Sequence, residues 1–312
     1  MSHLERALEL AERGRATTHP NPVVGAVVVD DGEVVGEGWH ERKGEPHAEA
    51  HALGRAGERA RGATLYVTLE PCTHQGSTPP CVDAVLAAGV ARVVIGALDP
   101  GPNGGGAERL RAAGVDVKLV DSREARRQNE AWRTWTRLGR PFVTYKAATT
   151  LDGRVTVPGE RWVSGEEARR LVHELRAASD AVAVGMGTVR ADEPRLDARG
   201  VPALRQPRRL AFGRGPLPDG SELELRVGPL REELEALAAD GVQSLLLEGG
   251  PTLATAFLDE GLVDKLLLFV APTLSGGGPH VLADLAAPVA LTELSARQIG
   301  ADVLLEAYVH QP

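Results

Sequence analysis

Three residues of the types that bind zinc occur within a short part of the chain. They are His47, Cys72 and Cys81; the two cysteines are the only ones in 312 residues, and each follows a proline. Zinc prefers nitrogen and thiolate ligands, and three protein ligands leave a fourth coordination position for water. Zinc brings the pKa of a bound water near neutrality, so that hydroxide is available at working pH. The three residues therefore predict a catalytic zinc site.

Glu49 supplies the other group that hydrolytic deamination needs. A carboxyl group can carry protons from water to a ring nitrogen and to a leaving amine. If His47 opens a helix, Glu49 lies on the same turn and can face the metal without binding it. A histidine and glutamate separated by one residue, followed by Pro-Cys and a second cysteine, is the signature of zinc-dependent base deaminases.

Two other interpretations of these residues stay open at this point. The cysteines can be small buried hydrophobic residues with no ligand role. Alternatively, His40, His51 or His74 can complete four ligands, which gives a closed structural zinc site.

Length and composition limit the classes of protein that fit. With 43% hydrophobic and 25% charged residues, the chain has the composition of an ordinary soluble globular protein, and its length suits two domains. A net charge of −8 argues against a nucleic-acid groove. No apolar run approaches the roughly 20 residues of a membrane helix, and the N-terminus lacks the apolar core of a signal peptide. With both cysteines assigned to a metal, none is left for a disulfide, so we expect a cytoplasmic protein without membrane or nucleic-acid partners.

The elements that must position these residues alternate between strand and helix patterns. An apolar run ends at Asp30-Asp31-Gly32, a hairpin-turn sequence, and a second strand returns to His40. His47 is expected to open a helix, and Cys81 the next one. Further strands are expected at 64–69, 92–97 and 115–120, with helices at 4–11, 108–113 and 122–138. The long helix 122–138 is expected to bury Ala125, Trp132, Trp135 and Leu138.

The same alternation resumes after Gly139-Arg140-Pro141, where we place a domain boundary, giving domains 1–140 and 141–312. Strands are expected at 142–146, 181–184, 208–212, 244–247 and 266–270, with an edge strand at 302–309. Helices are expected at 166–176, 230–239 and 252–258. The pattern indicates an α/β fold in which functional groups gather at strand ends and helix starts.

Two glycine-containing loops in the second half follow strands. Residues 184–188 lack the third glycine of a dinucleotide fingerprint. The run Glu248-Gly249-Gly250-Pro251-Thr252 leads from a strand into a helix, an arrangement that can hold a phosphate. A glycine pair can also simply turn the chain, so this loop alone decides little.

Motifs in the first half resemble the pyrimidine deaminase half of the bifunctional riboflavin-biosynthesis deaminase–reductase family. They are Asn21-Pro22-x-Val24-Gly25, Gly38-Trp39-His40, Pro46-His47-Ala48-Glu49, Thr68-Leu69-Glu70-Pro71-Cys72 and Thr78-Pro79-Pro80-Cys81. The resemblance implies a cytidine-deaminase-like α/β/α sandwich, zinc on His47, Cys72 and Cys81, and Glu49 as proton shuttle. It places Asn21 and His40 in the pyrimidine pocket, although Asn21 can equally be a turn residue and His40 a strand-end histidine. The turn 101–106 lacks the basic residue that relatives usually carry there.

Motifs in the second half resemble the reductase half of the same family, which has a dihydrofolate-reductase-like α/β fold. They lie at 146–154, 162–164, 184–196 and 248–250. The resemblance implies that the following residues contact NADPH: Thr149, Trp162, Thr188, Asp192, Gly250, Pro251 and Thr252. It also implies substrate contacts from Arg176, Leu196, Arg199 and Glu248. The turn 159–162 is shorter than is usual in the family, and Arg208, Arg209 and Arg214 are candidates for binding a 2′-phosphate.

The function that the resemblance implies has two steps on one small pyrimidine ribosyl phosphate. Zinc-dependent deamination of 2,5-diamino-6-ribosylamino-4(3H)-pyrimidinone 5′-phosphate is followed by NADPH reduction of the ribosyl side chain, and family members tend to be homo-oligomers. Two rival hypotheses are a zinc deaminase of another substrate fused to an unrelated reductase, and a non-catalytic protein with a structural zinc. The negative charge and the long spacing between the cysteines argue against the first rival, and the retained Glu49 argues against the second.

Overall fold

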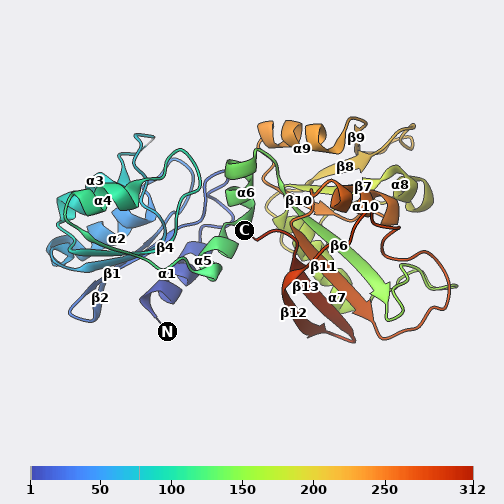
Figure 1. Ribbon diagram of the computed structural model, residues 1–312, viewed down its shortest axis with the longest axis horizontal. Helices are drawn as coiled ribbons and strands as arrows, with labels where there is room; N and C mark the ends of the chain where they lie inside the picture. Colours follow the sequence, from blue (N-terminus) through green and yellow to red (C-terminus); the bar gives the residue numbers. More distant parts are fainter. Residues whose placement is uncertain (1, 77, 312) are drawn as a thin grey trace. The chain divides into compact units, whose positions relative to one another are not determined.

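The computed structural model describes residues 2–76 and 78–311 and divides into two compact units, Met1–Leu138 and Gly139–Gln311. Each unit contains one β-sheet with helices on both faces (Figure 1). Within the described residues, the helices are too short or too polar to cross a bilayer. The two units are described separately below.

The sheet of the first unit has five strands in the order β2-β1-β3-β4-β5. Their bounds are β1 (Gly25–Asp30), β2 (Glu33–Trp39), β3 (Thr64–Leu69), β4 (Arg92–Ala97) and β5 (Asp116–Leu119). The first two form the expected hairpin, and Asp31 and Gly32 adopt the positive φ angles, 46° and 82°, that a tight hairpin turn requires. Strands β3, β4 and β5 are parallel, so their carboxyl ends share one edge of the sheet.

Helices cover both faces of this sheet. On one face lie α2 (Ala48–Ala56), α3 (Cys81–Ala88) and α4 (Gly106–Ala112), with the short 3-10 helix η1 (Gly57–Ala60) after α2. On the other face α1 (His3–Glu12) packs on β1, and Ala125 of α5 (Arg123–Gln128) lies against β4. This is the α/β/α sandwich expected from the sequence.

Helix α2 lies exceptionally close to β2. A Cβ atom added at Gly36 lies only 2.1 Å from the Ala52 carbonyl oxygen, and one at Gly38 lies 2.4 Å from the Ala48 carbonyl oxygen. Only glycine leaves room for this approach. The two glycines therefore determine how closely α2, which follows His47 and carries Glu49, packs on the sheet.

The prediction of a single helix at 122–138 is wrong. The structure has two helices, α5 and α6 (Glu130–Leu138), separated at Asn129. The buried Asn129 side chain accepts from the Val23 N–H at 2.9 Å and donates to the Val23 carbonyl at 2.8 Å, which fixes a non-helical residue. Ala125 is buried as expected, but Leu138 is 48% exposed, and Thr134 is the buried residue of α6.

The sheet of the second unit has eight strands in the order β12-β13-β11-β6-β10-β7-β8-β9. Their bounds are β6 (Phe142–Thr150), β7 (Ala181–Gly185), β8 (Arg208–Phe212), β9 (Glu224–Arg226), β10 (Ser244–Leu247), β11 (Lys265–Ala271), β12 (Thr292–Ile299) and β13 (Asp302–Tyr308). The six strands from β11 to β9 are parallel, and β13 and β12 are antiparallel. The prediction that the last strand is an edge strand is wrong, because β12 pairs outside it. Most side chains of β12 are exposed, so it has no alternating pattern to reveal it.

Helices also cover both faces of this second sheet. Residues of α7 (Glu166–Ala178) and α8 (Met186–Asp192) pack on one face. Residues of α9 (Leu230–Ala239) and α10 (Pro251–Asp259) pack on the other face. Because the six strands from β11 to β9 are parallel, their carboxyl ends lie along one edge of the sheet, where α/β folds bind ligands. The residues expected to bind cofactor and substrate lie in or beside the loops at this edge.

Candidate active sites

The three expected metal ligands come together at the carboxyl end of β3. His47 is the N-cap residue of α2, Cys81 is the first residue of α3, and Cys72 lies in the loop after β3. The ligand atoms of the three residues all lie within 4.8 Å of one another. His47 Nδ1 is 3.1 Å from Cys81 Sγ and 3.6 Å from Cys72 Sγ.

The chemistry of this donor set fits zinc, which favours imidazole and thiolate over carboxylate ligands. Cys72 also accepts a hydrogen bond from the Cys81 backbone N–H at 3.4 Å. The Cys81 thiol donates to the Cys72 sulfur, and with His47 nearby this lowers the pKa of Cys72 to about 4 against the effect of burial. The shared proton raises the pKa of Cys81 in turn. The two thiols thus share a proton, and metal binding displaces it.

Glu49 lies in the first turn of α2, two residues after His47, and its side chain is only 3% exposed. Burial raises the pKa of the Glu49 carboxyl, and the His47 ring and the Cys81 thiol are among the groups that act on it. A buried carboxyl group of raised pKa beside a metal site is suited to accepting and donating protons.

Asn21 and His40 adjoin this cluster. The Asn21 side-chain nitrogen lies 3.2 Å from His40 Nε2, and His40 Nδ1 lies 3.3 Å from the Pro46 carbonyl oxygen. The Pro46 oxygen can only accept, so Nδ1 carries the proton and Nε2 accepts from Asn21. Burial lowers the pKa of His40, which favours this neutral ring. The His40 and His47 rings lie edge to face with centroids 5.2 Å apart.

Glu70 is a residue of this region to which the sequence analysis gave no role. It is buried, and its carboxylate accepts from the Asp99 N–H at 3.1 Å and the Ala107 N–H at 2.8 Å, at the two ends of the glycine-rich turn. Thr73, next to Cys72, donates to the carbonyls of Asn103 and Gly104 in the same turn. The turn is thus fixed against the segment that carries Cys72. A charged residue directly after a buried strand was the available signal.

In the second unit a buried carboxylate organises the candidate substrate site. Glu248, directly after β10, accepts two hydrogen bonds from Arg176 of α7, at 2.6 and 3.0 Å. Lys146 of β6 lies 3.4 Å from the same carboxylate. Burial raises the pKa of Glu248, but Lys146 and Arg176 outweigh this effect and leave it below its usual range. Lys146 was not predicted as a site residue; a lysine within a buried strand was the signal for it.

Leu196 and Arg199 lie near this cluster, because Asp197, between them in sequence, contacts Arg176. The backbone carbonyl of Asp197 accepts from Arg176 at 3.2 Å, and its side chain pairs with Arg199 at 2.5 Å. Leu196 is buried with a φ of 54°, an uncommon conformation for a branched residue. The structure thus brings the four predicted substrate residues to one part of the sheet edge, with Arg199 exposed.

The residues predicted to contact a dinucleotide are more dispersed. Gly250 is the N-cap residue of α10 and Pro251 its first residue, and a Cβ on Gly250 lies 3.5 Å from Thr188 Oγ1, so α8 and α10 begin side by side. Thr149 is buried near the end of β6. Trp162 is 51% exposed, with the guanidinium groups of Arg161 and Arg169 at 5.0 and 5.4 Å from its ring. The two remaining residues are exposed at the surface: Asp192 and Thr252.

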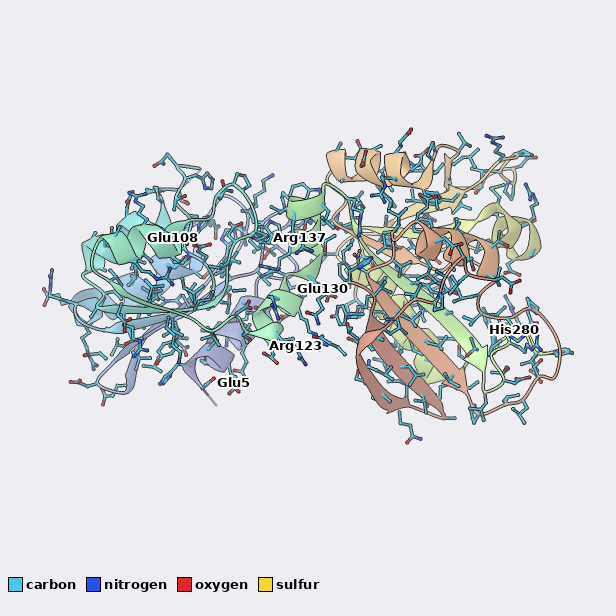
Figure 2. All side chains as sticks on the ribbon, in the orientation of Figure 1. Glu5, Glu108, Arg123, Glu130, Arg137 and His280 are labelled. Atoms are coloured by element: carbon cyan, nitrogen blue, oxygen red, sulfur yellow. The ribbon has the colours of Figure 1, made fainter. Side chains whose placement is uncertain are left out.

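Hydrogen bonds connect the loops after β6 and β11 beside these residues. Asp152 accepts from the backbone N–H groups of Ser275 and Gly276, at 3.0 and 2.8 Å, and from the Thr150 hydroxyl. Arg154 forms an isolated β-bridge with His280, which is labelled in Figure 2. These contacts hold two adjacent loops of the ligand-binding edge in one arrangement.

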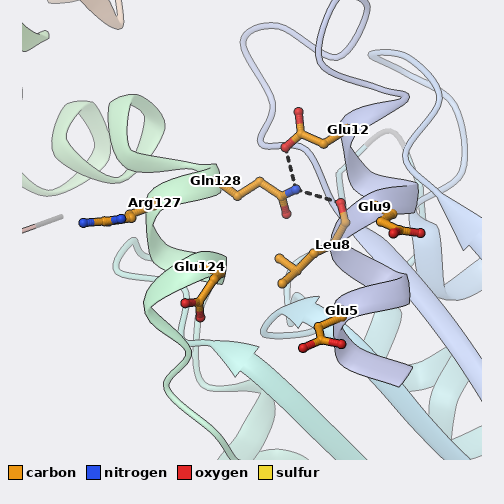
Figure 3. Close-up of a pocket in the computed structure, with 7 residues that line it drawn as sticks. All are labelled: Glu5, Leu8, Glu9, Glu12, Glu124, Arg127 and Gln128. Carbon is orange, nitrogen blue, oxygen red and sulfur yellow. Dashed lines mark hydrogen bonds between the residues drawn. The ribbon is translucent and has the colours of Figure 1, made fainter. Parts of the chain in front are cut away.

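A shallow depression elsewhere in the first unit contains none of the candidate residues. It lies between α1 and α5, where Gln128 donates to the Leu8 carbonyl and to Glu12 (Figure 3). Its remaining lining residues are mostly acidic: Glu5, Glu9, Glu124 and Arg127. It is separate from the His47–Cys81 cluster.

Comparison with families of known proteins finds one match in each unit. Residues 1–97 match the cytidine and deoxycytidylate deaminase zinc-binding region. Residues 141–219 and 221–305 match the RibD C-terminal domain. The matches confirm the fold classes expected for the two halves.

Individual relatives contain both halves in one chain. The riboflavin biosynthesis protein RibD of Aquifex aeolicus is 43% identical over 314 residues, which cover 89% of this chain and 88% of the relative. A solved structure of Acinetobacter baumannii RibD is 36% identical, with a TM-score of 0.85, and the match covers 98% of this chain and 97% of that one. The crystal structure of a diaminohydroxyphosphoribosylaminopyrimidine deaminase/5-amino-6-(5-phosphoribosylamino)uracil reductase from Thermotoga maritima is 34% identical, with a TM-score of 0.84 and the same coverage.

Proposed function

Because the chain belongs to the RibD family of riboflavin-biosynthesis proteins, we propose that His47, Cys72 and Cys81 bind the zinc of its deaminase and that Glu49 moves the protons. The protein is a bifunctional deaminase and reductase of riboflavin biosynthesis. We assign the deaminase to residues 1–140 and the reductase to residues 141–312. The observation that carries the deaminase assignment is the convergence of three ligand atoms within 4.8 Å beside a buried carboxyl group.

The first reaction replaces an amino group of the pyrimidine with a carbonyl oxygen that comes from water, and ammonia leaves. Zinc, when bound, supplies a Lewis acid that makes water nucleophilic near neutral pH. Glu49 takes one proton from the attacking water and delivers it to the ring nitrogen. It then takes the second proton, from the hydroxyl group that the water has become, and gives it to the amine, which leaves as ammonia. The burial and raised pKa of Glu49 suit both directions of transfer. Asn21 and the neutral His40 bind the polar edge of the pyrimidine and orient it.

This arrangement argues against a purely structural zinc. A structural site uses four protein ligands and gains nothing from a buried carboxyl group beside it. Of the described residues, His47, Cys72 and Cys81 alone form the ligand group here. His40, which was a candidate fourth ligand, has its two ring nitrogens directed to Asn21 and Pro46.

In the second reaction a hydride is transferred to the ribose carbon that bears the amine, in its open imine form. We propose NADPH as the donor, bound by Thr149, Trp162, Thr188, Asp192, Gly250, Pro251 and Thr252. The cofactor carries the hydride, and the protein positions the two reactants. Arg176, Leu196, the exposed Arg199 and Glu248 contact the substrate. Arg176 and Lys146 also hold Glu248 in place. Arg199 is suited to the substrate phosphate, because guanidinium binds phosphate through two parallel hydrogen bonds.

We further propose that the protein acts in the cytoplasm as a homo-oligomer on a small-molecule substrate. Commitment of both cysteines to a metal site supports a reducing compartment. The net charge of −8 supports a partner other than nucleic acid. Sedimentation of the purified protein tests the oligomer, and a monomer at micromolar concentration contradicts it.

Mass spectrometry of the product tests the two activities together. Zinc-loaded protein is incubated with synthetic 2,5-diamino-6-ribosylamino-4(3H)-pyrimidinone 5′-phosphate, with and without NADPH. We expect deamination alone without NADPH, and deamination with the addition of two hydrogen atoms in its presence. Reduction without deamination contradicts the proposed order, and an unchanged substrate contradicts the assignment of the substrate.

A further inference from the structure

We propose that Arg190 and Arg214 recognise the 2′-phosphate of NADPH and thereby select NADPH over NADH. This inference rests on the proposed function, because it assumes that the second unit binds a nicotinamide dinucleotide. It assigns to two residues a specificity that the sequence left open among Arg208, Arg209 and Arg214.

The carboxyl ends of three neighbouring strands form a continuous path for a dinucleotide. Strands β10, β7 and β8 are adjacent and parallel. Loops that contain glycine follow β10 and β8, whereas β7 ends at Gly185 and continues directly into α8. A Cβ on Gly250, after β10, lies 3.5 Å from Thr188 Oγ1 of α8. A Cβ on Gly213, after β8, lies 3.2 Å from the Met186 side chain at the start of α8. The loops after β10 and β8 therefore both adjoin the start of α8 along the edge of the sheet.

The position of the substrate site gives the dinucleotide a direction along this path. Lys146 and Glu248, in the proposed substrate site, belong to β6 and to the end of β10. The nicotinamide must lie there to transfer its hydride, because reacting atoms have to approach within about 3.5 Å. The adenosine end then extends past β7 towards β8. The loop that it reaches is Gly213-Arg214-Gly215.

Two guanidinium groups occur together at this end of the path. The Arg190 side chain donates to the Arg214 backbone carbonyl at 2.7 Å, and its Nη2 lies 2.8 Å from a Cβ placed on Gly215. Gly213 and Gly215 have φ angles of 124° and 125°, which glycine adopts without steric strain, so the turn that carries Arg214 depends on the glycine at each side of it. Both arginines are exposed. The ribose of an adenosine at this loop lies within reach of either side chain.

Ion pairs with carboxylates distinguish the other candidate arginines from Arg190 and Arg214. Arg208 pairs with Glu224 at 2.6 Å and with Asp240 at 3.0 Å. Arg209 pairs with Glu222 at 2.7 Å. Among residues 2–76 and 78–311, no carboxylate pairs with Arg190 or Arg214. Two unneutralised guanidinium groups at one loop favour a dianionic phosphate, which NADPH carries on its ribose and NADH lacks.

Direct binding to the full-length protein tests this assignment without relying on turnover. The Kd values of NADPH and NADH are measured by nicotinamide fluorescence for the wild type, Arg190→Gln, Arg214→Gln and the double variant. Adenosine 2′,5′-bisphosphate and AMP serve as competitors that differ only in the 2′-phosphate. Arg231→Gln removes the same charge from an exposed site on α9, where the side chain contacts only the Glu260 carbonyl among the described residues. Circular dichroism confirms that each variant is folded.

We expect the wild type to bind NADPH more tightly than NADH. Each single substitution should raise the Kd of NADPH about tenfold, with a larger effect in the double variant, because a charged hydrogen bond is lost. The Kd of NADH and that of AMP should stay unchanged, and Arg231→Gln should behave as the wild type.

Two results overturn the inference while leaving the proposed reductase intact. One is an unchanged preference for NADPH in the double variant. The other is an equal loss of NADPH and NADH binding, which assigns the arginines to a group that both cofactors share. A wild-type protein that binds neither dinucleotide instead contradicts the cofactor of the proposed function, and the inference with it.

Discussion

Glu248 is a buried carboxylate that holds two cationic side chains from different elements. Its side chain is 9% exposed, and those of Arg176 and Lys146 are 13% and 15% exposed. The Glu248→Gln substitution keeps the shape but leaves both cations without their counter-charge. Removing one partner of a buried pair costs about 3 kcal/mol. We therefore expect a clear fall in the thermal unfolding midpoint of the second unit, measured by calorimetry, whereas Glu235→Gln on the exposed face of α9 should leave it unchanged.

The pH dependence of the difference in unfolding midpoint between the wild type and Glu248→Gln shows whether the charge pairs cause it. The pKa of Glu248 is lowered in the folded protein by Lys146 and Arg176 acting against burial, from an ordinary value of 4.5. A lowered folded-state pKa gives stability that is present above the unfolded-state pKa and is lost as pH falls through the folded-state pKa. The midpoints of the wild type and Glu248→Gln should therefore stay apart at neutral pH and converge below pH 4.5. A difference that persists unchanged in acid contradicts the charge-pair explanation.

Single residues were predicted best where a residue of a chemically distinctive type lies at the predicted start of a helix or end of a strand. The sequence predicted that His47 and Cys81 open helices and that Cys72 follows a strand, and these positions suffice to bring the three ligand atoms together. Lys146 and Glu70 were not predicted as functional side chains. Their positions, a charge within or directly after a buried strand, marked them as unusual, but their roles depend on partners in distant elements, Glu248 and the 99–107 turn, which a local pattern cannot identify.

At the scale of the element, the close packing of α2 on β2 determines where His47 and Glu49 lie. The Gly36→Ala substitution places a Cβ 2.1 Å from the Ala52 carbonyl oxygen, so α2 has to shift. We expect a loss of about 1–3 kcal/mol in the free energy of unfolding. We also expect weaker zinc binding, because the shift moves His47 relative to the cysteines. Denaturant unfolding and competition with a zinc chelator measure the two effects.

Gly54 provides the matched control on the same helix. A Cβ at Gly54 meets nothing within 4 Å, so Gly54→Ala adds helix propensity without a clash. It should stabilise the first unit by up to about 1 kcal/mol and leave zinc affinity unchanged. If Gly36→Ala leaves the free energy of unfolding and the zinc affinity as little affected as Gly54→Ala does, the close approach of α2 to β2 does not have the proposed role.

Elements with a regular apolar pattern were predicted accurately, and those governed by tertiary contacts were not. The expected bounds of β8, α9 and β10 agree with the structure. The break at Asn129 was missed, because it depends on hydrogen bonds to Val23, which is 106 residues away in sequence. Strand β12 was missed because its exposed side chains lack alternation, and this omission made β13 look like an edge strand.

At the scale of the whole molecule, the two candidate sites belong to separate compact units, each with its own core. The family predicted from the motifs is confirmed by relatives that match nearly the whole chain. We expect removal of zinc by a chelator to abolish deamination but to preserve reduction of 5-amino-6-(5-phosphoribosylamino)uracil supplied directly. Separate assays of the two steps before and after chelation measure this. Loss of both activities indicates that the reductase also depends on the metal.

The central claim is that Glu49 carries protons beside a zinc bound by His47, Cys72 and Cys81. The most direct test is the zinc content and deamination rate of Glu49→Gln, with Glu58→Gln as an exposed control in the 3-10 helix that follows α2. We predict that Glu49→Gln retains the wild-type zinc content and loses deamination by about 100-fold or more. Wild-type deamination by the zinc-loaded variant contradicts the shuttle role, and loss of zinc together with activity contradicts the separation of Glu49 from the ligand set.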